Sequence, residues 1–192
     1  MLDRRTLLAA MASAPLLATG AFAQAPLLTA RMNGANVQLP IIGLGSARRY
    51  EDPQGEAQMA PLRATIARFV ELGGKLIDTA PTYGRAEEVL GQLIAELKLR
   101  DRLFLATKVS VDDRAQGLAQ IEASFRKLRT DRIDLIAVHN LRDVDDELAI
   151  LRDLKAKGRI RALGITTSFD GQYDAFEAVM RREPLDVIQV DY

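Results

Sequence analysis

A repeating alternation of short apolar runs with longer amphipathic segments most constrains how this chain can fold. Runs such as residues 133–139 are almost entirely aliphatic, whereas residues 86–98 place Val89, Leu93 and Leu97 on one helical face. Strands this apolar are typical of a parallel sheet that helices cover. The pattern therefore predicts an α/β fold.

The pattern predicts six strands and five intervening helices. We expect strands at residues 40–45, 75–78, 103–108, 133–139, 160–165 and 185–190. We expect helices at about residues 57–72, 86–98, 118–128, 148–157 and 173–180. A short hairpin of residues 28–32 and 37–39 should precede them, because Asn33-Gly34 readily takes the positive φ angles of a tight turn.

Two architectures fit this alternation: an open doubly wound sheet and a closed (β/α)8 TIM barrel. A dinucleotide-binding doubly wound fold carries G-x-G-x-x-G after its first strand, but Gly43-Leu44-Gly45 is followed by Ser46-Ala47-Arg48. The barrel is therefore favoured. Such a barrel typically uses about 250 residues and eight strand-helix units. We expect an incomplete barrel, because the chain has 192 residues and ends after the sixth strand.

Composition excludes several classes of function. Lys plus Arg and Asp plus Glu both number 26, so no net charge draws the chain to nucleic acid. Cysteine is absent, which excludes a thiolate nucleophile and cysteine-based zinc sites. His139 is the single histidine, so a multi-histidine metal centre is impossible. We expect neither a nucleic-acid partner nor a metal.

Residues 1–23 have the pattern of a targeting segment. Arg4-Arg5 precedes an uncharged stretch rich in Ala and Leu, and Ala21-Phe22-Ala23 fits a small-x-small cleavage site. This pattern resembles a twin-arginine signal, and it predicts export to the periplasm and a mature domain of residues 24–192. An ordinary secretory signal and an uncleaved anchor are the alternatives. Pro15 and the shortness of the stretch argue against a stable membrane span.

Four polar residues lie at or just past the ends of predicted strands. Asp78, Lys108 and His139 close three successive strands, and Tyr83 follows Asp78 in the next loop. Taken singly, each has a structural explanation: a loop cap, a packed ring, a solvated lysine or a hydrogen-bonded core histidine. Because catalytic groups of (β/α) barrels lie at the carboxyl ends of the strands, we interpret the four as one site.

The four side chains could transfer a proton to a carbonyl oxygen. A tyrosine can act as a general acid, and a neighbouring Lys108 ammonium would favour its phenolate form. Asp78 would pair with Lys108 and fix its position, and His139 would donate a hydrogen bond to the substrate oxygen. Since no side chain can supply a hydride, a nicotinamide cofactor is required.

At this point the motifs resemble those of the aldo-keto reductases. The segment Ile77-Asp-Thr-Ala-Pro-Thr-Tyr-Gly84 with Glu87-Glu-Val-Leu-Gly91 is similar to the family's hallmark, and three further motifs follow in the expected order: Thr107-Lys108, Asp134-Leu-Ile-Ala-Val-His139 and Gly164-Ile-Thr-Thr-Ser168. The resemblance implies an oxidoreductase that reduces aldehydes or ketones with NADPH, or with NADH. It makes Tyr83 the proton donor and completes a tetrad with Asp78, Lys108 and His139.

The same resemblance places the nicotinamide near residues of the first, second, fifth and sixth strands: Gly45, Ser46, Asp78, Thr166, Thr167 and Gln189. Relatives commonly have Ser-Asn in place of Thr166-Thr167, and threonine lacks the amide that can both donate and accept. Segments that grip the rest of the cofactor in relatives follow the sixth strand and have no counterpart before Tyr192. A barrel remnant acting as a non-catalytic binding or regulatory module is therefore the alternative function.

Overall fold

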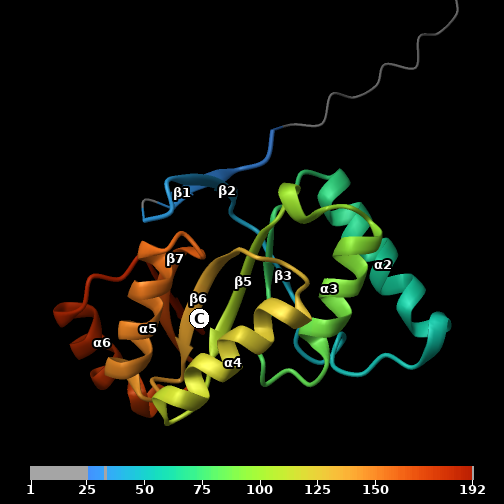
Figure 1. Cartoon of the computed structure of the whole chain (residues 1–192). Coiled ribbons are helices and arrows are strands. Elements are labelled where there is room, and N and C mark those ends of the chain that lie inside the picture. Colours follow the sequence, from blue (N-terminus) through green and yellow to red (C-terminus); the bar gives the residue numbers. More distant parts are fainter. Residues whose placement is uncertain (1–25, 33, 192) are drawn as a thin grey trace, which may run out of the picture.

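The computed structural model describes residues 26–32 and 34–191. Its main feature is a curled sheet of six parallel strands that lie side by side in chain order (Figure 1). The strands are β3 (Leu44–Gly45), β4 (Leu76–Asp78), β5 (Phe104–Val109), β6 (Ile133–His139), β7 (Ile160–Thr167) and β8 (Val187–Val190). This is the arrangement of an incomplete (β/α)8 barrel, as the sequence predicts.

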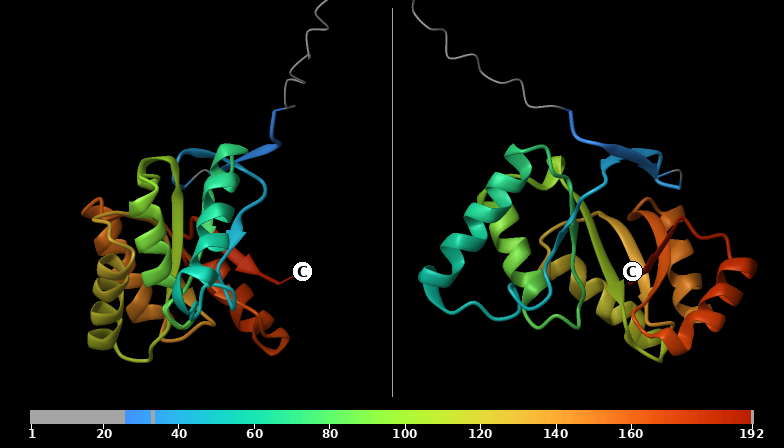
Figure 2. Two further views of the ribbon diagram at one scale, coloured as in Figure 1. Left: turned by 90° about the vertical axis from the view of Figure 1, so that its right-hand side faces the viewer. Right: turned by 180° about the vertical axis from the view of Figure 1, so that it is seen from behind.

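Helices alternate with the strands and cover the outer, convex face of the sheet. They are α2 (Gly55–Glu71), α3 (Ala86–Glu96), α4 (Arg114–Lys127), α5 (Val144–Ala156) and α6 (Tyr173–Arg182). The view from behind in Figure 2 shows the strands from the side that the helices leave uncovered. The fold therefore has the helix-outside layering expected for parallel strands.

The alternation of side chains along the strands divides the core into two parts. On β5, Leu105 and Val109 face outward and pack in the large cluster formed with the helices. Phe104 and Ala106 face inward and belong to a smaller cluster. All six residues of β5 are buried, so neither face of this strand is exposed to solvent, and its two polar residues, Thr107 and Lys108, are buried as well.

An antiparallel hairpin of β1 (Thr29–Met32) and β2 (Val37–Pro40) lies at the amino ends of the strands (Figure 1). Leu39 of this hairpin is 6% exposed and packs in the inner cluster with Phe104, Leu135 and Ala162. The hairpin therefore covers this end of the half-barrel. The carboxyl ends of the strands lie at the opposite end.

The predicted strand at residues 40–45 is wrong in its first part. Pro40 ends β2, and the amide of Ile41 donates a hydrogen bond to the carbonyl of Leu28, which continues the hairpin. Ile41 and Ile42 are 57% and 70% exposed, and only Leu44–Gly45 pair with β4. The apolar run did not distinguish a buried strand from an exposed link.

The other predicted elements are confirmed with shifted ends. The strand predicted at residues 160–165 extends to Thr167, so Thr166 and Thr167 belong to β7 rather than to the following loop. The last strand begins at Val187 rather than Leu185. The predicted leader and the turn residue Asn33 lie outside the described residues.

Both outer strands of the sheet have one partner each among residues 26–32 and 34–191: β3 pairs only with β4, and β8 only with β7. Ile188 and Val190 of β8 are 45% and 46% exposed.

No helix in the described part of the chain is long and apolar enough to cross a membrane.

Candidate active site

The strand register brings the predicted site residues to one end and one face of the sheet. His139 of β6 pairs in register with Thr166 of β7, which pairs with Gln189 of β8. Lys108 lies two residues past Ala106, the register partner of Asp78. Because side chains of a strand alternate between faces, all five side chains belong to the inner set at the carboxyl end.

Lys108 and Asp78 form a buried ion pair. The Lys108 ammonium donates to both carboxylate oxygens of Asp78, at 2.9 and 2.8 Å, and to the carbonyl of Thr79 at 2.9 Å. The Lys108 side chain is 2% exposed and that of Asp78 is 21% exposed. All three ammonium hydrogens therefore have acceptors, which makes burial of this charge tolerable. The predicted pairing of Asp78 with Lys108 is present.

Tyr83 lies in the loop between β4 and α3, against this ion pair. Its backbone amide donates to the carbonyl of Ala80 at 3.1 Å, and the next residue, Gly84, has a φ of 53°. The left-handed backbone at Gly84 suits glycine and turns the loop into α3. The centre of the Tyr83 ring lies 5.3 Å from the Lys108 nitrogen and 6.3 Å from the centre of the His139 ring. The structure therefore brings all four predicted residues together.

The electrostatics of Tyr83 differ from the sequence-based expectation. Burial and the Asp78 carboxylate raise the pKa of the Tyr83 phenol above its ordinary value of 10. The expected net lowering of this pKa by Lys108 was wrong, because burial of the phenol, and after it the charge of Asp78, outweigh the attraction of the ammonium. Tyr83 thus keeps its proton at neutral pH and is suited to donate it.

His139 is held in its neutral form. Burial, followed by the positive charge of Lys108, lowers the pKa of His139 to about 4. Its Nδ1 lies 3.5 Å from the hydroxyl oxygen of Thr82, at the outer limit of a hydrogen bond. When that hydroxyl donates to Nδ1, Nε2 carries the hydrogen and can donate to a ligand.

The residues predicted to hold a nicotinamide fall into two groups: those with a free polar group or open space beside them, and those whose polar group is already used within the protein. Ser46 is completely buried, and within the described chain its hydroxyl has no hydrogen-bond partner. Its backbone amide donates to the Asp78 carbonyl at 3.0 Å, which ties the end of β3 to the site. Gly45 borders open space, and Gln189 is exposed on β8 next to Thr166. These residues lie around the tetrad and have free polar groups or room for a ligand.

Thr167 belongs to the second group, because its hydroxyl is already used. It donates to the side-chain oxygen of Gln172 at 2.6 Å and accepts from the amide of Phe169 at 3.2 Å. Thr167 also alternates away from Thr166, to the outer set of β7. It therefore supports the loop after β7 and has no free hydroxyl hydrogen for a cofactor.

Sequence reasoning missed two residues of this site. Thr82 contacts His139, and Asn140, directly after His139, has a buried side-chain oxygen without a partner in the described residues. Asn140 also has a left-handed φ of 54°. Their sequence positions, in the loop before Tyr83 and at the end of β6, are the only signals that could have indicated them.

Unpartnered buried oxygens test whether a nicotinamide cofactor fits here. Three such atoms occur directly after the last residues of β3, β4 and β6: the hydroxyls of Ser46 and Thr79 and the amide oxygen of Asn140. Buried polar groups are normally hydrogen-bonded, so each needs a partner. These atoms are sealed from solvent, but the rim beside them is open, because Gly45 borders free space and the side chain of Gln189 is exposed. The open part of the rim therefore has room and a polar side chain for a nicotinamide riboside.

Fold and site together define the class of this protein: a parallel (β/α) barrel protein with a Tyr-Lys-Asp-His site at the carboxyl ends of its strands. The family model described as the aldo/keto reductase family matches residues 41–192. The chain therefore belongs to the aldo/keto reductase family.

Curated relatives agree with this assignment. The chain is 36% identical over 143 residues to the aldo-keto reductase YhdN of Bacillus subtilis, covering 67% of this chain and 42% of that protein. It is 36% identical over 138 residues to the methylglyoxal reductase YeaE of Escherichia coli, covering 68% and 46%. The chain thus spans about half the length of the curated relatives that it matches.

Solved structures give the same fold. An aldo/keto reductase from Klebsiella pneumoniae in complex with NADP and acetate is 31% identical, with a TM-score of 0.63 over 74% of this chain and 50% of that one. The glycerol dehydrogenase AKR11B4 of Gluconobacter oxydans is 31% identical, with a TM-score of 0.69 over 84% and 54%.

Proposed function

We propose that this protein reduces aldehyde or ketone carbonyls to alcohols with NADPH, and that Tyr83 is the general acid. The observation that carries this proposal is the contact of Tyr83 with the buried Lys108–Asp78 pair and with neutral His139. Relatives in complex with NADP and relatives named methylglyoxal reductases support the cofactor and the reaction class.

The chain's own residues would hold and orient the reactants. Ser46, Asn140, Thr166 and Gln189 would bind the nicotinamide and ribose end of the cofactor, and Gly45 leaves room for it. When bound, the cofactor supplies the hydride that no side chain can provide. Thr167 supports this rim through Gln172 rather than through a contact with the cofactor.

Proton delivery would fall to Tyr83. His139, neutral because of its lowered pKa, would donate a hydrogen bond to the carbonyl oxygen and orient it toward the Tyr83 hydroxyl. Tyr83 would then pass its proton to that oxygen as negative charge develops there. The Lys108 ammonium, 5.3 Å from the centre of the Tyr83 ring, would stabilise the phenolate that remains.

The test uses the purified chain without a histidine tag. NADPH fluorescence during titration reports cofactor binding, and the loss of NADPH absorbance with methylglyoxal as the probe reports turnover. We expect saturable binding and methylglyoxal-dependent oxidation of NADPH. No fluorescence change at high NADPH concentration would contradict the proposal.

The second candidate is a non-catalytic binding or regulatory module. The observation that favours it is the exposure of Ile188 and Val190 on the outer strand β8, next to the cofactor residues. NADPH binding without turnover on methylglyoxal or other small aldehydes and ketones would support this module over the reductase.

We also propose that residues 1–23 direct export to the periplasm by the twin-arginine route. Arg4-Arg5 and the Ala21-Phe22-Ala23 pattern support this. Replacing both arginines by lysine should leave the full chain in the cytoplasmic fraction, whereas Arg31→Lys should not. Export that survives the double replacement would point to the general secretory route instead.

A further inference from the structure

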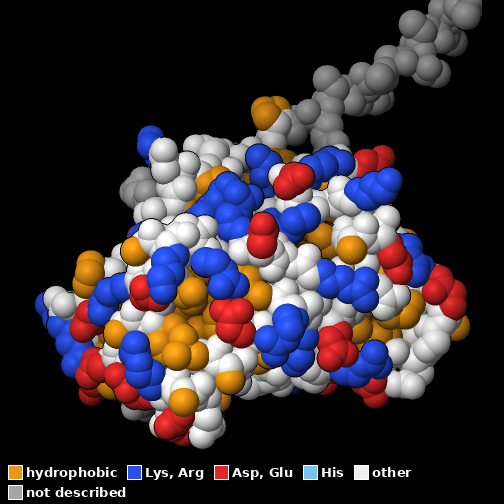
Figure 3. Space-filling view, in the orientation of Figure 1, with side chains coloured by type: hydrophobic (Ala, Val, Ile, Leu, Met, Phe, Trp, Pro, Cys, Tyr) orange, Lys and Arg blue, Asp and Glu red, His pale blue; other side chains and the backbone are white. Residues whose placement is uncertain are grey.

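Glu87 is a buried acidic residue that the proposed carbonyl reduction does not use. It lies in the first turn of α3 and is 2% exposed. Its neighbour Glu88 is exposed and forms an ion pair with Arg85, as is usual on the outer, helix-covered face, where acidic and basic side chains are intermixed (Figure 3). The side chain of Glu87 instead turns inward, to the end of β5.

One buried hydrogen bond joins Glu87 to β5. The hydroxyl of Thr107, a residue that is 1% exposed, donates to one carboxylate oxygen of Glu87 at 2.7 Å. The other carboxylate oxygen has no hydrogen-bond partner in the described residues. Burying a carboxylate with so few partners costs stability. Stability alone therefore does not explain an acidic residue at this position.

This hydrogen bond connects the same two parts of the chain as the contact of Tyr83 with Lys108. Thr107 directly precedes Lys108 on β5, and its side chain belongs to the outer set, whereas that of Lys108 belongs to the inner set. The amide of Ala86 donates to the carbonyl of Tyr83 at 2.9 Å, which ties the Tyr83 loop to the start of α3. The bond between Glu87 and Thr107 therefore holds the start of α3 against the end of β5 from the outer face.

Glu87 acts on Lys108 without touching it. Burial raises the pKa of the Glu87 carboxyl, and the hydrogen bond from Thr107 and the charge of Lys108 are among the influences that oppose this rise. The Lys108 ammonium itself donates to Asp78 and to a backbone carbonyl. The mechanical connection from Glu87 to Lys108 therefore runs through Thr107 and the backbone of β5.

We propose that Glu87 is a positioning residue that holds the Lys108 ammonium against the Tyr83 ring. It acts through Thr107, whose hydroxyl it binds, and so through the end of β5. This role rests on the proposed carbonyl reduction, in which Lys108 stabilises the phenolate that Tyr83 leaves. Because proton transfer depends strongly on the positions of the groups, a shift of β5 should lower the rate of the chemical step. Affinity for substrate and cofactor should change little, since Glu87 and Thr107 lie on the outer side of the sheet.

Removal of one hydroxyl in Thr107→Val tests this role, and Thr107→Ser is the conservative variant that keeps the hydroxyl. We expect Thr107→Val to lower kcat for methylglyoxal at least about tenfold with KM nearly unchanged, and Thr107→Ser to retain most of kcat. Glu87→Gln keeps an oxygen that can accept the hydrogen bond from Thr107, so it should also retain kcat.

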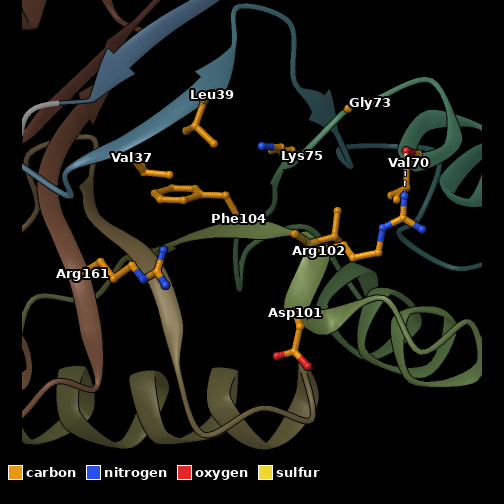
Figure 4. A pocket seen from close by; sticks show the side chains of 11 residues that line it. Val37, Leu39, Val70, Gly73, Lys75, Asp101, Arg102, Phe104 and Arg161 are labelled. Atoms are coloured by element: carbon orange, nitrogen blue, oxygen red, sulfur yellow. Dashed lines mark hydrogen bonds between the residues drawn. The ribbon is translucent and has the colours of Figure 1, made fainter.

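A double variant separates positioning from stability. Thr107→Val combined with Glu87→Met replaces both partners by apolar side chains of similar shape, so no buried polar group is left without its partner. We expect the free energy of unfolding in urea to recover, whereas kcat stays low. The matched control is Phe104→Leu at the other end of β5, where Figure 4 shows the Phe104 ring in the wall of a cavity beneath the hairpin. This variant should lower stability but leave kcat unchanged.

Two kinetic results would overturn the positioning role. One is an unchanged kcat in Thr107→Val. The other is a kcat that recovers together with stability in the double variant, because packing alone would then account for the effect of Thr107→Val.

The proton NMR signals of His139 in the tag-free chain decide the same question without turnover. If the wild type does not oxidise NADPH with methylglyoxal, the proposed reduction fails, but this measurement still applies. Burial, and after it the charge of Lys108, hold the pKa of His139 low. Displacement of Lys108 in Thr107→Val should therefore shift the titration midpoint of His139 upward. An unshifted midpoint would contradict the positioning role.

Discussion

Lys108 and Asp78 form an ion pair in which one ammonium contacts both carboxylate oxygens, at 2.9 and 2.8 Å, inside the carboxyl rim of the half-barrel. The Lys108 side chain is almost completely buried, whereas the Asp78 side chain is one fifth exposed at 21%. Loss of one partner therefore leaves the other charge with few alternative partners.

We expect Lys108→Met to lower the free energy of unfolding by about 2–3 kcal/mol, because it leaves the Asp78 carboxylate unpaired in a mostly buried position. Adding Asp78→Asn to this variant should recover part of the loss. Urea denaturation of both variants measures the difference. Lys157→Met is the control, because its ion pair with Asp153 is exposed and should contribute little. A double variant no more stable than Lys108→Met alone would contradict the coupling.

Tyr83→Phe removes only the phenolic hydroxyl and keeps the ring that packs against Lys108 and His139. If Tyr83 is the acid, kcat/KM for methylglyoxal should fall by at least about 100-fold, the usual contribution of general acid catalysis. NADPH affinity should be nearly unchanged, because the ring is retained. Stopped-flow kinetics and fluorescence titration separate the two quantities. Retained turnover would refute the assignment of Tyr83.

His139 makes the stability of the protein depend on acid pH. Its pKa is about 4 in the folded chain, against about 6.5 for an unperturbed histidine. Between these values the unfolded state binds more protons, so the free energy of unfolding should fall as the pH drops from 6.5 toward 4. His139→Gln should remove this contribution and flatten the decline.

The single histidine also permits a direct measurement. Because the chain has no other imidazole, one set of proton NMR signals in tag-free protein reports His139 alone. We expect its titration midpoint near 4. A midpoint near the ordinary histidine value would show that burial and Lys108 do not hold His139 neutral.

The tetrad could be predicted from sequence because of where polar residues interrupt the apolar runs. Asp78, Lys108 and His139 stand at or next to the last residues of three parallel strands, and such ends meet at one edge of the sheet. The alternation of side chains then gives them one face. This logic needs only the strand positions, which the apolar runs of a parallel sheet indicate well.

What the sequence could not predict depends on loop geometry and on charge pairing. The contact of Thr82 with His139 and the unpartnered oxygen of Asn140 follow from loop conformations that no periodicity describes. The raised pKa of Tyr83 follows first from the burial of its ring and hydroxyl and then from the charge of the nearby Asp78 carboxylate, and the sequence pattern encodes neither. The exposed link at Ile41 looked like a strand because its composition is apolar.

Gly91 sets the spacing of two helices. A Cβ atom at this position of α3 would lie 2.0 Å from the carbonyl oxygen of Lys127 in α4, so the helices must separate to admit it. We expect Gly91→Ala to lower the free energy of unfolding by about 1–3 kcal/mol, despite the better helix propensity of alanine. Gly171→Ala is the control, because no heavy atom lies within 4 Å of the position that its methyl group would take. Equal stability of the two variants in urea would contradict this role.

Glu147 of α5 should make the free energy of unfolding depend on pH in the direction opposite to that of His139. It is fully buried, and neither carboxylate oxygen has a hydrogen-bond partner in the described residues. Gly117 of α4 makes room for it, since a Cβ there would lie 2.1 Å from a carboxylate oxygen. Burial, then the negative charges of Asp143 and Asp146, raise the pKa of Glu147 to about 7, and Arg114 opposes them.

The direction of this pH effect follows from the difference between the numbers of protons that the folded and unfolded states bind. Between about 4.5 and 7 the folded state binds the extra proton, so the contribution of Glu147 is fully present below about 4.5 and is lost as the pH rises through 7. Glu147→Gln, which is neutral at every pH, should therefore be more stable than the wild type above pH 7 and should lose that advantage near pH 4.5. Thermal denaturation across this range measures it, with the exposed Glu177→Gln as the control. An advantage of Glu147→Gln that does not change with pH would mean that Glu147 stays ionised inside the fold, stabilised by Arg114.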